Sequence, residues 1–184
     1  MASIGLEFDV VPSHVPEVRA AHEPAPEYVA RLSRDKAEAI ARTRPQEWVI
    51  AADTTVLLGD ELLEKPADDV DARRMLAKIA GNTHLVYTGV TLQNVSLDYR
   101  DTRITESEVR MLPLSRPEID WYVATGEPSD KAGAYAVQGI GSMFIEAVRG
   151  SFTNVVGLPL ATLYLMLRQA GIDPLAINGG SEEP

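Results

Sequence analysis

Apolar residues recur along the chain with the two spacings that distinguish helices from strands. Spacings of three and four residues predict helices over residues 27–42, 68–80, 115–125 and 160–170. Alternating or continuous apolar runs predict strands over residues 6–12, 48–53, 83–92, 102–112 and 143–148. The glycine-rich stretch 126–142 shows no clear period and predicts a loop. Helices and strands that alternate in this way indicate a single α/β domain.

Several local signals mark where these elements begin and end. Asp68 is a typical N-cap, and Gly81 follows the helix that it starts. Ser115 and Glu118 have the spacing of a capping box. The pair Gly59-Asp60 predicts a two-residue hairpin turn between residues 54–58 and 61–65.

An acidic residue follows directly on the apolar run of residues 48–52. Asp53 therefore stands where a strand buried on both faces is expected to end. One explanation is a solvated aspartate in a turn. The other is a functional acid, because open α/β sheets bind ligands beyond the carboxyl ends of their strands. The local sequence leaves both open.

Two lysines raise a similar question. Lys36 falls on the apolar stripe of the first helix, where a lysine ordinarily lays its stem along the core and extends its ammonium to water. The predicted hairpin pairs Thr54 with Lys65 and so returns Lys65 to within one residue of Asp53. Strict alternation points these two side chains to opposite faces, so their convergence requires twist or a bulge.

Composition narrows the class of function. The chain has 184 residues, 45% of them hydrophobic, and a formal net charge of -10, which disfavours binding to long nucleic acids. A lysine close to a phosphate can still bind a small anion, because distant charges are screened over about 8 Å. The sequence shows neither a membrane span nor a signal peptide, so we expect a cytoplasmic protein. The absence of cysteine excludes thiol nucleophiles and disulfides.

The common catalytic motifs are absent: there is no His-Glu-x-x-His, Gly-x-Ser-x-Gly or Walker A pattern. Acids and lysines on different predicted elements remain as candidates, namely Glu17, Lys36, Asp53, Lys65, Asp130 and Lys131. Carboxylates suit Mg²⁺, and lysines neutralise phosphate oxygens. Together they favour phosphoryl or nucleotidyl chemistry.

Two long stretches carry a family resemblance. ADTTVLLGDELLEKPADDVDARRMLAKIAGNTHLVYTGV and GEPSDKAGAYAVQGIGSMFIEAVRGSFTNVVGLPL resemble the signature regions of the Maf nucleoside triphosphate pyrophosphatases, and the match extends from Gly5 to Gly171. The resemblance implies an elongated, two-lobed α/β fold related to the inosine triphosphate pyrophosphatases, with a mixed twisted sheet, flanking helices and a central cleft. It implies hydrolysis of a nucleoside triphosphate to the monophosphate and pyrophosphate with a divalent cation, Mg or Mn.

The resemblance also implies roles for individual residues. Asp53 matches the proton acceptor of the family. Thr54 and Gln138 match positions that sort members by base, and their identities are similar to those of the branch that acts on dTTP and UTP. Lys36 and Lys65 match other residues of the cleft.

Glu17 also matches a cleft residue, and we expect it to hold the cation with Asp53. His14 and Pro16 stand where family members commonly carry acids, which weakens this metal site. The alternatives are a nucleotide-binding regulator of septum formation and cell division with little turnover, and a 7-methyl-GTP pyrophosphatase. A homodimer is plausible for the family.

The beginning of the sequence departs from the family pattern. Maf proteins normally start with a short strand and a Ser-x-Ser-Pro-Arg-Arg loop, and this sequence has neither. A start codon assigned too late and a genuinely shortened form are the two explanations, and the first is favoured because a strand missing from inside a sheet leaves backbone groups unpaired. We expect one domain over residues 1–177 and a disordered tail over residues 178–184.

Overall fold

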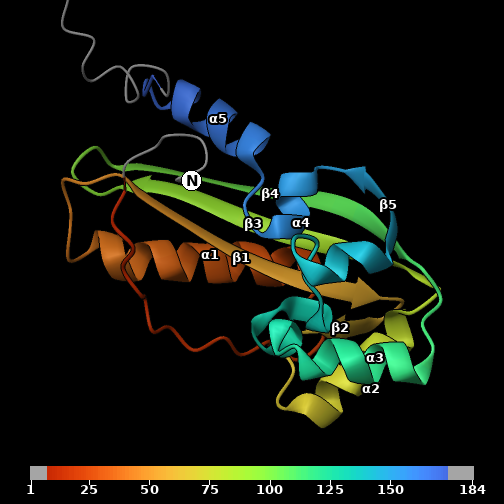
Figure 1. Ribbon diagram of the computed structural model, residues 1–184. Helices are drawn as coiled ribbons and strands as arrows, with labels where there is room; N and C mark the ends of the chain where they lie inside the picture. Colours follow the sequence, from red (N-terminus) through yellow and green to blue (C-terminus); the bar gives the residue numbers. More distant parts are fainter. Residues whose placement is uncertain (1–7, 174–184) are drawn as a thin grey trace, which may run out of the picture.

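The computed structural model describes residues 8–173, which form one antiparallel sheet with helices on both faces (Figure 1). The strands are β1 (Val49–Leu58), β2 (Glu61–Leu63), β3 (Thr83–Asn94), β4 (Tyr99–Met111) and β5 (Ile145–Gly150). The α-helices are α1 (Ala25–Ala41), α2 (Asp69–Ile79), α3 (Arg116–Ala124), α4 (Phe152–Val156) and α5 (Leu160–Gln169). Three short 3-10 helices are η2 (Glu127–Asp130), η3 (Ala132–Ala134) and η4 (Ile140–Phe144).

The sheet has the order β2-β1-β3-β4-β5. Each of these neighbouring pairs is antiparallel. The expected α/β class with flanking helices is confirmed, whereas the expected mixture of parallel and antiparallel pairs is not found among the described strands. The argument that placed a ligand beyond the carboxyl ends of parallel strands therefore does not apply to this sheet.

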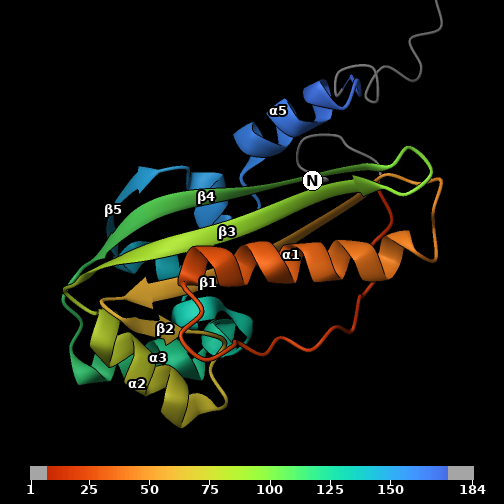
Figure 2. The ribbon, with the colours of Figure 1, turned by 180° about the vertical axis from the view of Figure 1, so that it is seen from behind.

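Helix α1 covers one face of the sheet, and α4 and α5 cover the other (Figures 1 and 2). Strand β1 supplies both interfaces because successive side chains alternate between faces. Val49 and Ala51 pack with α1, whereas Ile50 and Ala52 pack with α5. Asp53 continues the row that faces α1, and Thr54 continues the row on the opposite face.

The close approach of α1 to the sheet depends on Gly89 of β3, which lies opposite Asp53 in the ladder. A Cβ atom at Gly89 would lie 2.6 Å from the carbonyl carbon of Val29 and 2.8 Å from the nitrogen of Ala30. Because both are backbone atoms of α1, the helix would have to move away. Glycine at this position therefore sets how near α1 lies to Asp53.

Most local signals in the sequence correspond to structure. The Asp68 side chain accepts a hydrogen bond from the Asp71 amide at the start of α2, and Ser115 with Glu118 forms a capping box for α3. The hairpin turns at Gly59 and Asp60 and pairs Leu58 with Glu61, as expected.

Other expectations are corrected. Residues 8–12 form no strand, and residues 6 and 7 of that predicted strand lie outside the described part. Strand β1 does not end at Asp53 but continues to Leu58, so Asp53 lies in its middle. Strand β2 ends at Leu63, so Lys65 does not pair with Thr54 as expected. The ladder partner of Thr54 is Thr88, on the β3 side of β1. The predicted last strand begins at Ile145, and the helix α4 was not predicted.

The continuation of β1 past Asp53 depends on tertiary structure. The apolar pattern of residues 48–58 is interrupted by Asp53, Thr54 and Thr55, but pairing with β3 and packing against α1 keep the stretch in one strand. The expected domain end at residue 177 and the expected tail over residues 178–184 lie outside the described residues.

Candidate active site

A cavity of about 260 Å³ opens where β2 stops pairing with β1. Its wall includes α1, the middle of β1, the exit of β2, the turns around η2 and η3, and the end of α4. The charged residues that line it are Glu17, Lys36, Asp53, Glu64, Lys65, Asp130 and Lys131. Segments far apart in the sequence thus bring four acids and three lysines to one place.

Asp53 and Lys36 form the centre of this cluster. The Lys36 ammonium donates to Asp53 Oδ1 across 2.6 Å; the Lys36 side chain is 17% exposed and the Asp53 side chain 9%. Lys36 reaches Asp53 because both lie in the interface between α1 and the sheet. The lysine on an apolar stripe is therefore explained by a buried carboxylate opposite it.

Glu17 joins the two lysines on the open side of the cluster. Its Oε1 lies 2.6 Å from Lys36 Nζ, and its Oε2 lies 3.8 Å from Lys65 Nζ. Lys65 follows the end of β2, so strand alternation no longer constrains it, and no bulge at Thr54 is needed for its convergence. Its side chain is 62% exposed, which leaves its ammonium accessible to a ligand.

The environment shifts the pKa values of these groups in different directions. Burial raises the pKa of Asp53 above its ordinary value, although Lys36 acts against that effect. The hydrogen bond from Lys36 lowers the pKa of the more exposed Glu17. Burial acts to lower the pKa of Lys36, but its hydrogen bonds to Asp53 and Glu17 outweigh burial and raise it. The two carboxylates that share the charged lysine are thus shifted in opposite directions, Asp53 toward a stronger base than an ordinary aspartate and Glu17 toward a weaker base than an ordinary glutamate.

Ion pairs hold the irregular segment that carries Glu17. Arg31 of α1 bonds both carboxylate oxygens of Glu23, at 2.7 and 2.8 Å, and donates to the Val18 carbonyl at 2.9 Å. The hydroxyl of Tyr28 donates to Glu64 Oε1 at 2.5 Å and lies 3.3 Å from the Glu17 carbonyl oxygen. The sequence analysis did not identify Tyr28 or Glu64, because a tyrosine on a helix and one acid in a hairpin carry no distinctive spacing.

The two residues expected to recognise a base lie in different surroundings. Thr54 lines the cavity on the side of β1 opposite Asp53, and a Cβ at Gly157 would lie 3.5 Å from its hydroxyl oxygen. Gln138 is exposed and is not among the residues that line this cavity. The structure therefore brings together Glu17, Lys36, Asp53, Thr54 and Lys65, but it does not bring Gln138 to them.

The donor set fits a hard divalent cation in part. Mg²⁺ commonly uses one or two protein carboxylates and completes its shell with water and substrate phosphates. Glu17 and Asp53 both contact Lys36, so their carboxylates lie close together and could supply such oxygens. Among residues 8–173 no group of three or more His, Cys, Asp or Glu side chains is arranged to hold a metal by itself.

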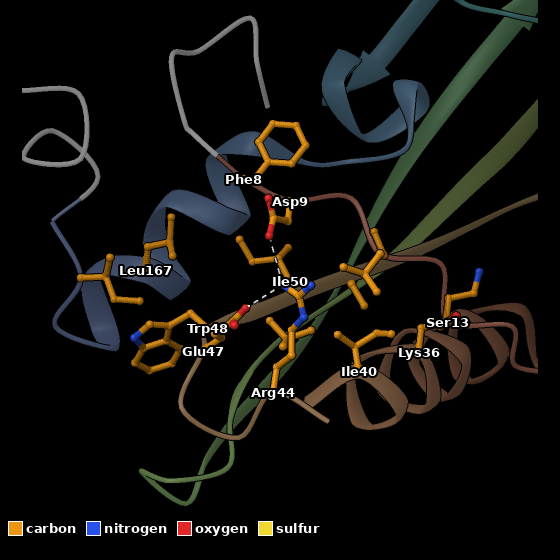
Figure 3. Close-up of a pocket in the computed structure, with 15 residues that line it drawn as sticks. Phe8, Asp9, Ser13, Lys36, Ile40, Arg44, Glu47, Trp48, Ile50 and Leu167 are labelled. Atoms are coloured by element: carbon orange, nitrogen blue, oxygen red, sulfur yellow. Dashed lines mark hydrogen bonds and ion pairs between the residues drawn. The ribbon is translucent and has the colours of Figure 1, made fainter. Parts of the chain in front are cut away.

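A larger hollow of about 480 Å³ adjoins the charged cavity and shares Lys36 and Ala52 with it. Figure 3 shows it between α1, the start of β1 and α5. Apart from Lys36, its charged side chains pair with one another, since Arg44 lies 3.1 Å from Asp9 and 3.0 Å from Glu47. The smaller cavity therefore carries the candidate chemistry.

Among residues 8–173, no helix combines the length and apolar character needed to cross a membrane.

Comparisons with known proteins show which sequences this chain resembles. The family model described as Maf-like protein matches residues 1–170. A dTTP/UTP pyrophosphatase from Koribacter versatilis (strain Ellin345) is 47% identical over 91% of this chain and 86% of its own length. A dTTP/UTP pyrophosphatase from Anaeromyxobacter dehalogenans (strain 2CP-C) is 49% identical over 93% of this chain and 87% of its own length. One from Syntrophus aciditrophicus (strain SB) is 44% identical over 91% and 82%, respectively.

Proposed function

This chain belongs to the Maf-like protein family, and from that premise we propose that it is a nucleoside triphosphate pyrophosphatase acting on dTTP and UTP. The reaction gives the nucleoside monophosphate and pyrophosphate and removes these nucleotides from the pool. The observation that carries the proposal is the convergence of Asp53, Lys36, Glu17 and Lys65 in one cavity. The names of the relatives support the choice of substrates.

Asp53 acts as the general base. Its carboxylate accepts a proton from water as the water oxygen attacks phosphorus, and the bridge between the α and β phosphates breaks. Its raised pKa makes it a better proton acceptor than an ordinary aspartate. Lys36 fixes the carboxylate through Oδ1 and leaves Oδ2 for the water.

The lysines neutralise the phosphates. Lys65 is largely exposed, and Lys131 lines the same cavity, so both can meet the oxygens of a triphosphate. Interactions that strengthen as charge moves onto the leaving pyrophosphate accelerate the reaction. A divalent cation such as Mg²⁺ or Mn²⁺, held by Asp53 and Glu17 with the substrate phosphates, would add charge neutralisation at this place.

Pyrophosphate release tests the proposal directly. The purified protein is incubated with dTTP, UTP or 7-methyl-GTP, with Mg²⁺ and with excess EDTA, and the products are separated by chromatography. We expect the monophosphate and pyrophosphate from dTTP and UTP, little turnover of 7-methyl-GTP, and loss of activity with EDTA. Faster hydrolysis of 7-methyl-GTP would contradict the substrate assignment. Nucleotide binding without pyrophosphate release would favour the regulator instead.

Since dTTP and UTP are cytoplasmic nucleotides, we place the activity in that compartment.

A further inference from the structure

We propose that Thr88, a buried residue outside the cavity, makes Thr54 a hydrogen-bond acceptor and thereby selects a ring N3–H, as in uracil and thymine, over the bare N3 of cytosine. Thr88 is a positioning residue in this account, because it acts through Thr54 and does not touch the substrate. The inference rests on the proposed function, since it concerns the nucleotide that binds beside Thr54.

A chain of three oxygens connects the cavity to α4. Thr54 Oγ1 lies 2.8 Å from Thr88 Oγ1, and Thr88 Oγ1 lies 3.0 Å from the carbonyl oxygen of Asn154. Thr88 and Asn154 are fully buried, so water cannot replace either contact. Thr54, in contrast, lines the cavity and is only partly buried.

The number of protons fixes the direction of both hydrogen bonds. A carbonyl oxygen has no proton, so the proton between Thr88 and Asn154 comes from the Thr88 hydroxyl. That hydroxyl has no second proton to give. The proton between Thr54 and Thr88 must therefore come from Thr54. As a result, the Thr54 oxygen has only lone pairs left to offer to a ligand in the cavity.

The place of Thr54 in the cavity indicates which part of a nucleotide it meets. Asp53 and Lys36 lie on the face of the sheet covered by α1, whereas Thr54 projects to the opposite face. The part of the wall that comes from α4 and the residue after it consists of Val155, Val156 and Gly157, none of which is charged. A Cβ at Gly157 would lie 3.5 Å from Thr54 Oγ1, so this uncharged wall lies directly against the hydroxyl.

The triphosphate belongs beside the lysines, and the uncharged base belongs beside this wall. Uracil and thymine carry a hydrogen-bond donor at N3, whereas cytosine presents a lone pair at the same ring position. A Thr54 oxygen that can only accept forms a hydrogen bond with the N3–H of uracil or thymine. It repels the N3 lone pair of cytosine, because neither atom supplies a proton. Sites that depend on a buried polar partner discriminate strongly, because the wrong ligand leaves a polar group unpaired.

Asn154 holds the chain in place. Its side-chain nitrogen donates to the Val86 carbonyl at 3.0 Å and to Ser107 Oγ at 3.0 Å, which ties α4 to β3 and β4. The Asn154 carbonyl therefore cannot shift away from Thr88 without breaking these bonds. The direction of the Thr54 hydrogen bond is thus fixed by its buried partners, and the Thr54 hydroxyl does not rotate to donate into the cavity.

The test replaces Thr88 by valine, which keeps the shape but removes the hydroxyl. The Thr54 hydroxyl is then free to donate, and we expect the ratio of kcat/KM for UTP to that for CTP to fall about 10-fold. Thr88→Ser restores the hydroxyl and is expected to restore the ratio. The same ratio is measured in binding, by calorimetry with the α,β-methylene analogues of UTP and CTP.

Thr91→Val is the matched control. Thr91 is a buried threonine of the same strand whose hydroxyl contacts Ser33 and Thr102, away from the cavity, so its replacement should leave the ratio unchanged. The inference would be overturned if Thr88→Val lowered kcat/KM equally for UTP and CTP. It would also be overturned if Thr91→Val lowered the ratio of the two values as much as Thr88→Val does. If Thr88→Val does not fold, Thr54→Val must reduce the ratio for the inference to stand. Absence of turnover in the unmodified protein would refute the proposed function alone, because the binding ratio still decides the role of Thr88.

Discussion

The ammonium of Lys36 lies 2.6 Å from Asp53 Oδ1, in the interface where α1 packs against the sheet. This contact joins the middle of α1 to the middle of β1. A charged pair so nearly buried costs desolvation energy that its attraction repays only with good geometry. We therefore interpret the pair as functional, and the following predictions test it and its surroundings.

Asp53→Asn is expected to lower kcat by about 10²- to 10⁴-fold, because asparagine cannot accept the proton from water. The fold should stay intact, because asparagine has the size of aspartate and Lys36 keeps Glu17 as a second carboxylate partner. Pyrophosphate release and circular dichroism measure the two effects. Asp120→Asn, which removes a remote carboxylate paired with Arg73, serves as the control. Full activity in Asp53→Asn would remove Asp53 from the mechanism.

Lys36→Met is expected to move the acidic limb of the pH-activity profile to higher pH. Burial raises the pKa of Asp53, and Lys36 now holds that rise in check. Without Lys36 the pKa of Asp53 rises further, and the base is protonated, and so inactive, at a higher pH. The measurement is kcat/KM for UTP as a function of pH.

Lys78→Met is the corresponding control, because Lys78 of α2 pairs with Glu61 of β2 and neither residue lines the cavity. It should leave the limb in place. An unshifted limb in Lys36→Met would mean that Asp53 is not the group that titrates.

Glu23→Gln is expected to reduce the free energy of unfolding near neutral pH by up to ~1 kcal/mol, and this difference should disappear in acid. The hydrogen bond from Arg31 lowers the pKa of Glu23 to about 2. The folded-state pKa is depressed, so the stabilisation is present above the ordinary value of 4.5 and is lost as pH falls toward 2. Urea unfolding at several pH values measures it. A difference that persists at pH 2 would show that the effect is not electrostatic.

Gly89→Ala is expected to destabilise the fold by about 1–3 kcal/mol, because the added methyl overlaps the backbone of α1. Displacement of α1 should also lengthen the contact between Lys36 and Asp53 and lower activity. The measurements are the melting temperature and kcat. Gly59→Ala is the comparison, since nothing lies within 4 Å of a Cβ there, although its φ of +59° costs some strain. Only the change at Gly89 should affect kcat.

Local signals predicted much of the secondary structure. The N-cap at Asp68, the capping box at Ser115 and the turn at Gly59 depend on residues within a few positions of one another, and each formed as expected. The antiparallel order of the sheet and the continuation of β1 through Asp53 could not be predicted in the same way. They depend on the pairing of β1 with β3, which are separated by α2 in the sequence.

The candidate site, too, was predicted from the sequence only in part. The sequence by itself determined which residues are candidates for the chemistry, since Asp53, Lys36, Lys65 and Glu17 are acids or lysines in unusual contexts or in family motifs. Only the tertiary structure decided that these four meet, that Gln138 lies apart from them, and that Thr54 faces away from Asp53 toward α4. The physical reason is that periodicity and capping are local, whereas burial, hydrogen-bond direction and pKa depend on which distant segments pack together.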